Sequence, residues 1–437
     1  MKTKLLSAAL ALIFCCGLLA GCGGEEKKEV NITVKVPTLR MAPKNDSSVK
    51  DSYGFLVKAA ESFQKQYKDA DVKVKVTMFE ATEQVAEIDK AFGTPEAADV
   101  FYADFFNSTT YVYTGRAVPL DDIITPAMRH DIDERFFERY SQRGKTYLMP
   151  FLYRQNVMGY NKDLFRQCGL EQYISDENEV QNWSLAEWEY ILATLKQRLP
   201  GNIYPMMLYA GNNQGDTHIM ALLRSQGSTF FDKDGYFALE TPEGVAGLKW
   251  LKSLNDRGYC PPSPQSLVIS DCGQLFKNGQ LAMYFVNDAR GDMYSFPVGY
   301  VNFPSTGARG ISTNFYTGFA VFDNGDAQKL AAAKAFVKYI YESDFIDYSS
   351  GSIPCSKRVI EKYAKELTGL QRYINNADTA VRITADNPNW VEVREAFYPQ
   401  IKKLLTGEST PEEAAKLLDE NCNAAIKRGR EESSLHK

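Results

Sequence analysis

Apolar residues recur along the chain with two periods, one typical of strands and the other of helices. Alternation predicts strands over 32–36 and 72–76, and a short apolar run predicts a third over 98–102. Helical spacing predicts helices over 53–67 and 81–92, so strands and helices alternate. This order is typical of a parallel sheet with right-handed crossovers.

The rest of the chain continues with α/β elements in a less regular order. Ser184, Thr241 and Thr410 stand where helix N-caps are expected, and Pro242 suits a first helical turn. The later predictions are strands over 146–153, 157–160, 281–285 and 318–322, and helices over 184–199, 241–255, 327–341 and 414–426. The whole pattern therefore predicts an α/β protein.

The N-terminus predicts export. Lys2 and Lys4 precede an apolar run that is too short to span a bilayer, and small residues lead up to Cys22. Residues 1–21 are therefore predicted to be a removable signal peptide. Cys22 resembles the lipid-attachment site of exported bacterial lipoproteins, so we expect lipidation there. The alternative is an ordinary cleavable signal with an incidental cysteine.

Charge and size describe a globular chain that does not suit nucleic acid. Removing 1–21, which holds two lysines and no acid, shifts the formal charge from −5 to −7, whereas phosphate binding needs a basic face. The remaining length suits two to three domains. No second apolar run reaches membrane-spanning length.

Cysteines and enzyme motifs predict no metal site, no cofactor and no catalytic residue. Gly144-Lys145-Thr146 lacks the earlier glycine of a P-loop, and three widely separated histidines do not form a metal site or triad. A carboxylate pair for glycoside hydrolysis stays open, because carboxylate separation is a tertiary property. Five cysteines, odd in number and widely spaced, predict buried thiols whose pairing is undetermined: Cys168, Cys260, Cys272, Cys355 and Cys422.

Five local patterns occur in an order that resembles one known family. Tyr160-Asn161-Lys162-Asp163-Leu164-Phe165 is the most recognisable of them. The patterns are 98–101 with 115–122, 147–151 with 158–165, 276–283, 316–321, and 389–394 with 405–415. Together they are similar to the extracellular solute-binding proteins of family 1, which are the substrate receptors of ABC importers.

The resemblance implies a two-lobed, type II periplasmic-binding-protein-like α/β fold with the ligand cleft between the lobes. The chain is expected to cross between lobes near Tyr153, Phe296 and Glu342. The implied parts are a tether at 22–30, a first lobe at 31–153 plus 297–342, a second lobe at 154–296 plus 343–430, and a disordered tail at 431–437.

The resemblance also implies ligand-binding residues. Trp390 matches the family's ligand-stacking tryptophan, although a tryptophan that caps the core is the alternative. Asp104, Phe105 and Asn107 follow the third strand and are expected to line the first lobe's side of the cleft, or else to cap a helix and pack in the core.

Further candidates follow the crossing and a later strand. Tyr153 and Arg154 lie at the first crossing, where a solvated arginine is the alternative. Asn287, Asp288 and Arg290 stand where the family often has a tryptophan, so charged groups would replace ring stacking there. The weaker candidates are Arg40, Asp216, His218 and Tyr316.

These observations predict a monomeric, lipid-anchored receptor at the outer face of the cell membrane or in the periplasm. We expect it to bind a small solute, most simply a mono- or oligosaccharide, and to pass it to ABC permease subunits. Two alternatives stay open: an exported polysaccharide-degrading enzyme, and a receptor for a non-sugar anionic solute. Arginines that converge on one cleft would favour an anion, and exposed rings a neutral saccharide.

Overall fold

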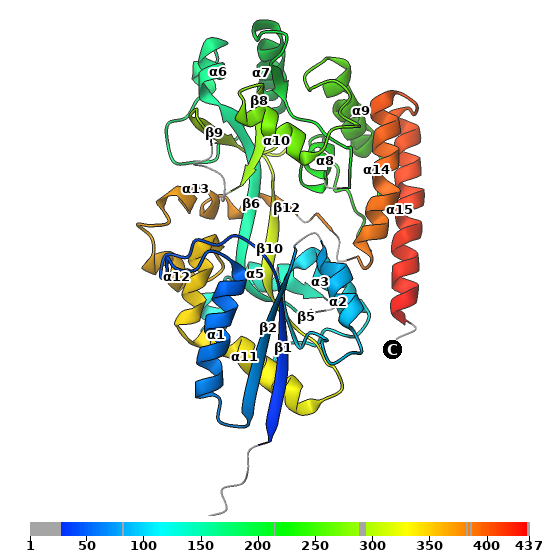
Figure 1. Cartoon of the computed structure of the whole chain (residues 1–437). Coiled ribbons are helices and arrows are strands. Elements are labelled where there is room, and N and C mark those ends of the chain that lie inside the picture. The colour runs from blue at the N-terminus through cyan, green and yellow to red at the C-terminus, as the bar shows by residue number, and fades with distance from the viewer. Residues whose placement is uncertain are drawn as a thin grey trace, which may run out of the picture.

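The computed structural model describes residues 28–80, 83–142, 144–213, 215–287, 294–381, 383–384 and 387–434. They form two α/β lobes, placed one above the other in Figure 1 and joined by two long strands. The predicted fold class is therefore confirmed. The predicted signal peptide and Cys22 lie outside the described residues.

The first lobe contains the predicted strand and helix alternation. Strands β1 (Glu29–Pro37), β2 (Asp71–Phe79) and β3 (Val100–Asp104) are parallel, in the order β2-β1-β3. Val34 lies opposite both Val76 and Val100, which keeps one apolar row in register across the sheet. The lobe also holds α1 (Ser52–Gln66), α2 (Gln84–Ala91), α3 (Phe105–Tyr113), α4 (Pro126–Asp131), α5 (Glu134–Tyr140), α11 (Ala327–Glu342) and the hairpin β4 (Ser141–Gln142) and β5 (Lys145–Thr146).

Strands β6 (Met149–Asn161) and β10 (Ser312–Val321) run through the centre of the molecule. They are antiparallel to each other, and β10 also pairs with β3 in the first lobe. The two strands predicted over 146–153 and 157–160 are a single strand of 13 residues. It reads as two because polar residues at its middle interrupt the apolar pattern, although they are mostly buried.

The second lobe is built on the far end of β6. Strand β8 (Leu281–Asn287) and strand β9 (Val298–Val301) pair antiparallel with β6, and β7 (Tyr204–Met206) pairs parallel with β8. Its helices are α6 (Lys162–Gln167), η2 (Glu171–Tyr173), α7 (Leu185–Arg198), α8 (Asp216–Leu223), α9 (Pro242–Asp256) and α10 (Ile269–Lys277). Ser184 and Glu187 form a capping box that starts α7, as its sequence indicates.

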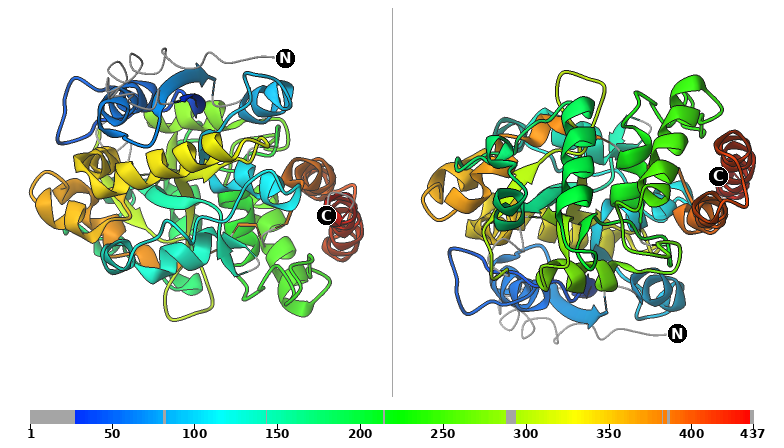
Figure 2. Two further views of the ribbon diagram at one scale, coloured as in Figure 1. Left: turned by 90° about the horizontal axis from the view of Figure 1, so that it is seen from below. Right: turned by 90° about the horizontal axis from the view of Figure 1, so that it is seen from above.

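The C-terminal part lies along both flanks. Helices α14 (Trp390–Thr406) and α15 (Pro411–Ser434) pack on α9 and also contact α3 of the first lobe. Figure 2 shows them on one flank, with α12 and α13 on the opposite flank. The connecting elements are η4 (Asp344–Gly351), β11 (Ile353–Pro354), α12 (Lys357–Lys362), η5 (Thr368–Leu370), α13 (Gln371–Ile374), η6 (Ala377–Thr379) and β12 (Ala380–Val381).

Several predicted boundaries differ from the structure. Strand β1 begins at Glu29, inside the predicted tether, and α15 continues to Ser434, inside the predicted tail. The lobe boundaries at Phe296 and Glu342 stay predictions. The pairing of the strands that follow each of them favours boundaries later in the sequence. Strand β9 pairs with the second-lobe end of β6, and β11 pairs with Tyr153 and Leu152.

A network of side-chain amides joins the crossing strand to the connecting segment. Asn302 and Asn376 each donate to the other's side-chain oxygen, at 2.9 and 2.8 Å. Asn376 also donates to Gln155 Oε1 at 3.0 Å, and Gln155 Nε2 donates to the Asn376 carbonyl at 3.2 Å. All three side chains are buried, so each depends on the others for its hydrogen bonds.

We therefore predict that Asn376→Ala destabilises the protein. The substitution leaves the buried amides of Gln155 and Asn302 short of partners, at a cost of about 2–4 kcal/mol. The measurement is chemical denaturation followed by tryptophan fluorescence. Asn375→Ala is the matched control and should change stability little, because Asn375 is exposed and its side chain bonds to no described residue besides Gln371. Equal stability of the two variants would contradict a supporting role for the network.

Candidate ligand-binding site

The carboxyl ends of strands from both lobes meet at the middle of the molecule. Asp104 ends β3 and lies opposite Thr317 of β10, while Asn287 ends β8 and lies opposite Asn156 of β6. Open α/β sheets generally bind ligands beyond such strand ends. This junction is therefore the candidate site.

Asp104, Phe105 and Asn107 lie at this junction by their backbone position. Strand β3 ends at Asp104 and α3 begins at Phe105 with no intervening loop. These residues therefore directly follow the third strand, as the sequence indicates. Whether their side chains touch a ligand stays a prediction.

A polar row crosses three neighbouring strands at the same level. Thr313 of β10 pairs with Asn156 of β6, and Asn156 pairs with Asn287 of β8. Residues directly opposite each other in a sheet present their side chains on one face. Two oxygens of this row, Asn156 Oδ1 and Thr313 Oγ1, are buried and have no hydrogen-bond partner in the described part of the chain. The row therefore offers acceptors that the protein does not use.

Tyr153 and Tyr316 form an aromatic group with Phe136. The two tyrosines are paired across β6 and β10, with ring centroids 6.2 Å apart, and Phe136 lies 5.0 Å from Tyr153. Tyr153 is buried, and the hydroxyl of Tyr316 accepts a hydrogen bond from Asn314 at 3.0 Å. This contact makes the group part of the strand core, and a ligand contact for either tyrosine stays a prediction.

Arg154 and Arg40 meet, but not through two guanidinium groups. Arg154 Nη2 donates to the main-chain carbonyl of Arg40 at 3.2 Å. Side chains alternate along a strand, so Arg154 projects from the face of β6 opposite to Tyr153. Consequently Arg154 fixes the loop that carries Arg40, and the structure gives no convergence of these two positive charges.

Asp216, at the first turn of α8, is the centre of a buried polar cluster. Its carboxylate accepts hydrogen bonds from Trp390 Nε1 at 3.1 Å, Arg394 Nε at 2.6 Å and Tyr398 Oη at 2.6 Å. These three donors are spaced by four residues and therefore lie on one face of α14. The cluster fixes α14 against α8, and Asp216 is only 2% exposed. Burial, and then the nearby Asp216 carboxylate, raise the pKa of Tyr398 well above its usual value.

Trp390 begins α14, as its sequence indicates, but its indole is largely enclosed. The side chain is 3% exposed, and its ring is stacked on Phe237 with centroids 6.3 Å apart and an interplanar angle of 20°. With Nε1 bonded to Asp216, this placement favours the core-capping alternative. Stacking of a ligand on Trp390 stays a prediction.

His218 does not lie in an exposed site. Its side chain is fully buried, with Nε2 3.1 Å from the carbonyl of Tyr209, to which it donates, and its ring beside those of Tyr209 and Phe285. This placement favours a structural role for His218 in the second lobe, and a ligand contact there stays a prediction. Burial lowers the pKa of His218 to about 3, which keeps the imidazole neutral.

Comparison with known proteins agrees with this geometry. Residues 46–344 match the family described as bacterial extracellular solute-binding protein. The chain belongs to this family. Its members are binding proteins, and the family is extracellular.

Individual relatives are distant. This solute-binding protein is 26% identical, over 73% of its length and 77% of the relative's, to a Brucella abortus (strain 2308) protein whose name gives no ligand. The arabinooligosaccharide-binding protein of Bacillus subtilis (strain 168) is 26% identical over 47% of this chain and 46% of its own.

Solved structures share the fold. The Listeria monocytogenes protein Lmo0181, in complex with cycloalternan, superposes with a TM-score of 0.68 and 20% identity, over 92% of this chain and 99% of its own. The GacH receptor of Streptomyces glaucescens gives a TM-score of 0.69 at 20% identity, over 91% and 98%. At such identities the likeness establishes the two-lobed fold alone.

Some predicted residues are not described by the structure, and some residues of the site were not predicted. Asp288, Arg290 and Cys22 lie outside the described residues. The sequence predicted Asn287 of the polar row, and Asp216 and Trp390 of the Asp216 cluster. It did not predict the other members, which are Asn156, Thr313, Arg394 and Tyr398. The spacing of Trp390, Arg394 and Tyr398 by four residues could have indicated the cluster, whereas Asn156 and Thr313 read as ordinary polar strand residues.

We predict that His218 makes stability depend on pH. Below its ordinary pKa of 6.5, the unfolded imidazole takes up a proton that the folded one refuses until about pH 3. As the pH is lowered from roughly 6 to 4, the free energy of unfolding should therefore fall by about 1.4 kcal/mol for each pH unit. The free energy of unfolding, measured by urea denaturation at several pH values in that range, should depend less steeply on pH in His218→Gln than in the native protein. The exposed His130→Gln is the control, and parallel slopes for His218→Gln and the native protein would contradict the assignment.

Proposed function

We propose that this solute-binding protein takes up a neutral carbohydrate between its lobes and delivers it to an ABC importer. The observation that carries the proposal is the polar row at the junction of the lobes. Its unpartnered acceptors, Asn156 Oδ1 and Thr313 Oγ1, call for a ligand that brings hydrogen-bond donors. Sugar hydroxyls both donate and accept hydrogen bonds, so they can meet the groups of this row.

The ligands named for relatives support the same class. An arabinooligosaccharide-binding protein is among the sequence relatives, and similar folds were solved with cycloalternan and with acarbose. These relatives share a class of polyhydroxylated ligand rather than one sugar. The size and identity of the saccharide bound by this chain are therefore left to measurement.

An anionic solute is the less favoured candidate. Asn156 Oδ1 can only accept a hydrogen bond, so it would repel an anion placed against it. Arg154 is directed to the carbonyl of Arg40 rather than to a shared anion site. Both features favour the neutral ligand.

Binding is proposed to act through closure of the lobes. A ligand shifts a conformational equilibrium only if it binds the closed form better than the open form. Strands β6 and β10 are the natural hinge, since they pass between the lobes, and the polar row sits on them. Closure would bring the strand ends of both lobes onto one solute and present a changed surface to the permease.

Attachment to the membrane is proposed through lipidated Cys22. Among the described residues no helix is long and apolar enough to cross a membrane. The predicted export signal before Cys22 and the extracellular family both support an exported, surface-held protein. Metabolic labelling with a fatty-acid analogue should mark the native chain but not Cys22→Ser, and labelling of both would remove Cys22 as the attachment site.

A saccharide ligand should raise the melting temperature and should be recovered intact. A ligand present at a hundred times its Kd, bound only by the folded state, adds about 2.7 kcal/mol. Thermal-shift screening should compare arabino- and malto-oligosaccharides with anionic solutes, followed by calorimetry and a reducing-end assay. Release of new reducing ends would contradict a receptor and support the enzyme alternative, and stabilisation by anions alone would contradict the carbohydrate.

Thr313→Val tests the polar row directly. Because Oγ1 has no partner among the described residues, its loss should leave stability unchanged or slightly raised. Affinity for the best saccharide of the screen should nevertheless fall about tenfold, or about 1.4 kcal/mol. Thr77→Val is the matched control, because its buried hydroxyl on β2 also has no partner in the part of the chain that the structure describes, but lies away from the row. Unchanged affinity in Thr313→Val would remove the row from the site.

A further inference from the structure

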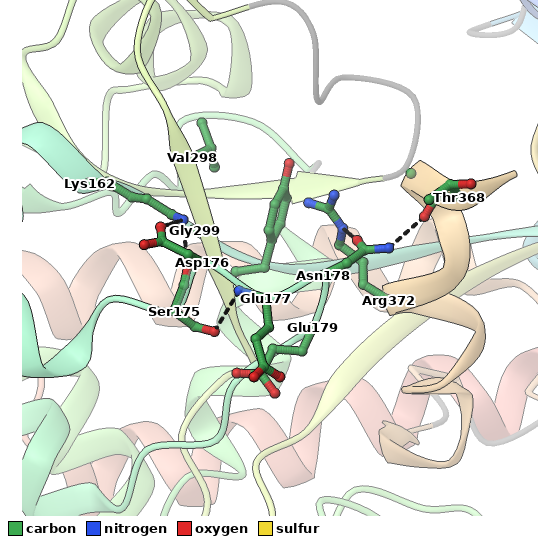
Figure 3. Close-up of a pocket in the computed structure, with 12 residues that line it drawn as sticks. Lys162, Ser175, Asp176, Glu177, Asn178, Glu179, Val298, Gly299, Thr368 and Arg372 are labelled. Carbon is green, nitrogen blue, oxygen red and sulfur yellow. Dashed lines mark hydrogen bonds and ion pairs between the residues drawn. The ribbon is translucent and has the colours of Figure 1, made fainter. Parts of the chain in front are cut away.

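A pocket of about 260 Å³ lies on the flank of the second lobe, away from the junction of the lobes. Its walls come from Lys162 at the start of α6, the loop at 175–179, strand β9, and the consecutive helices η5 and α13. None of the residues discussed for the junction lines it. Figure 3 shows the Lys162 side of the pocket facing the Arg372 side.

Hydrogen bonds fix both walls of this pocket. On one side Lys162 donates to the carboxylate of Asp176 at 2.9 Å and to the carbonyl of Ser175. On the other, the amide of Asn178 donates to the carbonyl of Thr368 at 2.6 Å and accepts from Arg372 Nε at 2.8 Å. The loop is therefore anchored at both ends, which gives the pocket a defined shape before any ligand enters.

Arg372 is held with its terminal groups unused. Its guanidinium lies 4.0 Å from the ring centroid of Tyr300, and Nε is bonded to Asn178. No hydrogen bond or ion pair joins its two Nη groups to any described residue. A guanidinium fixed in this way presents two parallel donors at a defined distance, the geometry that suits paired oxygen acceptors.

The same pocket also offers acceptors without partners. The carboxylates of Glu177 and Glu179 make no hydrogen bond or ion pair within the described residues. With Asp176 already paired to Lys162, these two carboxylates and Arg372 are the polar groups left for a ligand. Arg372 supplies donors and the two glutamates supply acceptors. Their charges sum to −1, so an anionic ligand would be repelled.

We propose that this pocket is a second carbohydrate-binding site, which takes one sugar ring with neighbouring hydroxyls. Adjacent hydroxyl oxygens at one edge of the ring accept from the two Nη groups of Arg372, and hydroxyls at the opposite edge donate to Glu177 and Glu179, whose carboxylates lie away from Arg372 in Figure 3. Val298 and Gly299 supply the apolar wall. The volume lies just below the range of about 300–1,000 Å³ usual for small-molecule sites, which limits the ligand to a single ring or the end of a longer chain.

The ring charge separates this proposal from other ligands. D-glucose, D-glucosamine and D-glucuronate share one ring and differ in charge, so they serve as neutral, cationic and anionic probes. Titration is followed by the side-chain ¹H–¹⁵N signals of arginine Nε and asparagine amides. The Arg372 signal is identified by its absence in Arg372→Lys. Glucose should shift the Arg372 and Asn178 signals saturably, with glucuronate at least tenfold weaker.

Two variants distinguish a role of Arg372 in sugar binding from a purely structural role. Arg372→Lys keeps the charge but loses the fork, so glucose affinity measured at the Asn178 amide should fall at least tenfold while the fold persists. Arg309→Lys, at an arginine that bonds Asp378 and Asn376 outside the pocket, should leave it within twofold. Thr313→Val should not change the pocket titration, which separates this site from the one at the lobe junction. No saturable shift with glucose, or tighter binding of glucosamine or glucuronate by tenfold, would overturn the proposal.

Discussion

Backbone hydrogen bonds between β6 and β10 hold both lobes in one continuous sheet, and the site depends on this pairing. Because β6 is 13 residues long, its first half completes the sheet of the first lobe and its second half begins that of the second. The strand ends of the two lobes are thereby aimed at one level, where Thr313, Asn156 and Asn287 lie side by side. Motion between the lobes must bend or twist these strands, so binding groups placed on them respond directly to closure.

Buried polar groups then fix the elements around this hinge. The amides of Gln155, Asn302 and Asn376 tie the crossing strand to the connecting segment, while Asp216 holds one face of α14 to α8. Such groups are costly unless every hydrogen bond is made, which gives each cluster a single arrangement. Asn156 Oδ1 and Thr313 Oγ1 are among the buried atoms without a hydrogen-bond partner in the described residues, and they lie at the junction of the lobes. Their place on the hinge strands, opposite each other in the sheet, is the reason for assigning them to a ligand.

The sequence predicted the elements well and their polar contacts poorly, for a physical reason. Alternation, helical spacing and caps are local, so β1, α1 and α7 appear nearly where expected. The division of β6 into two strands was wrong because buried polar residues look like a turn when only neighbours in sequence are considered. Gln155 and Asn376 are 221 residues apart, and no local pattern indicates that they meet.

Site residues were predicted with mixed outcome for the same reason. The start of α14 at Trp390 follows from a local pattern, but the enclosure of its indole depends on Asp216, 174 residues away. His218 sits in a helix whose residues are all buried, and this burial, which favours a structural role, has no local signal in the sequence. The flank pocket joins segments near 175, 300 and 370, and only the folded chain brings its donors and acceptors together.

The central claim is that an unaltered saccharide is held between the lobes by groups on the hinge strands. A crystal structure grown with the saccharide that stabilises the chain most tests it directly. The account predicts an intact ligand at the junction, with hydroxyl groups within hydrogen-bond distance of Asn156 or Thr313 and contacts from both lobes. A cleaved ligand, or an intact one bound only to one lobe away from β6 and β10, would contradict it.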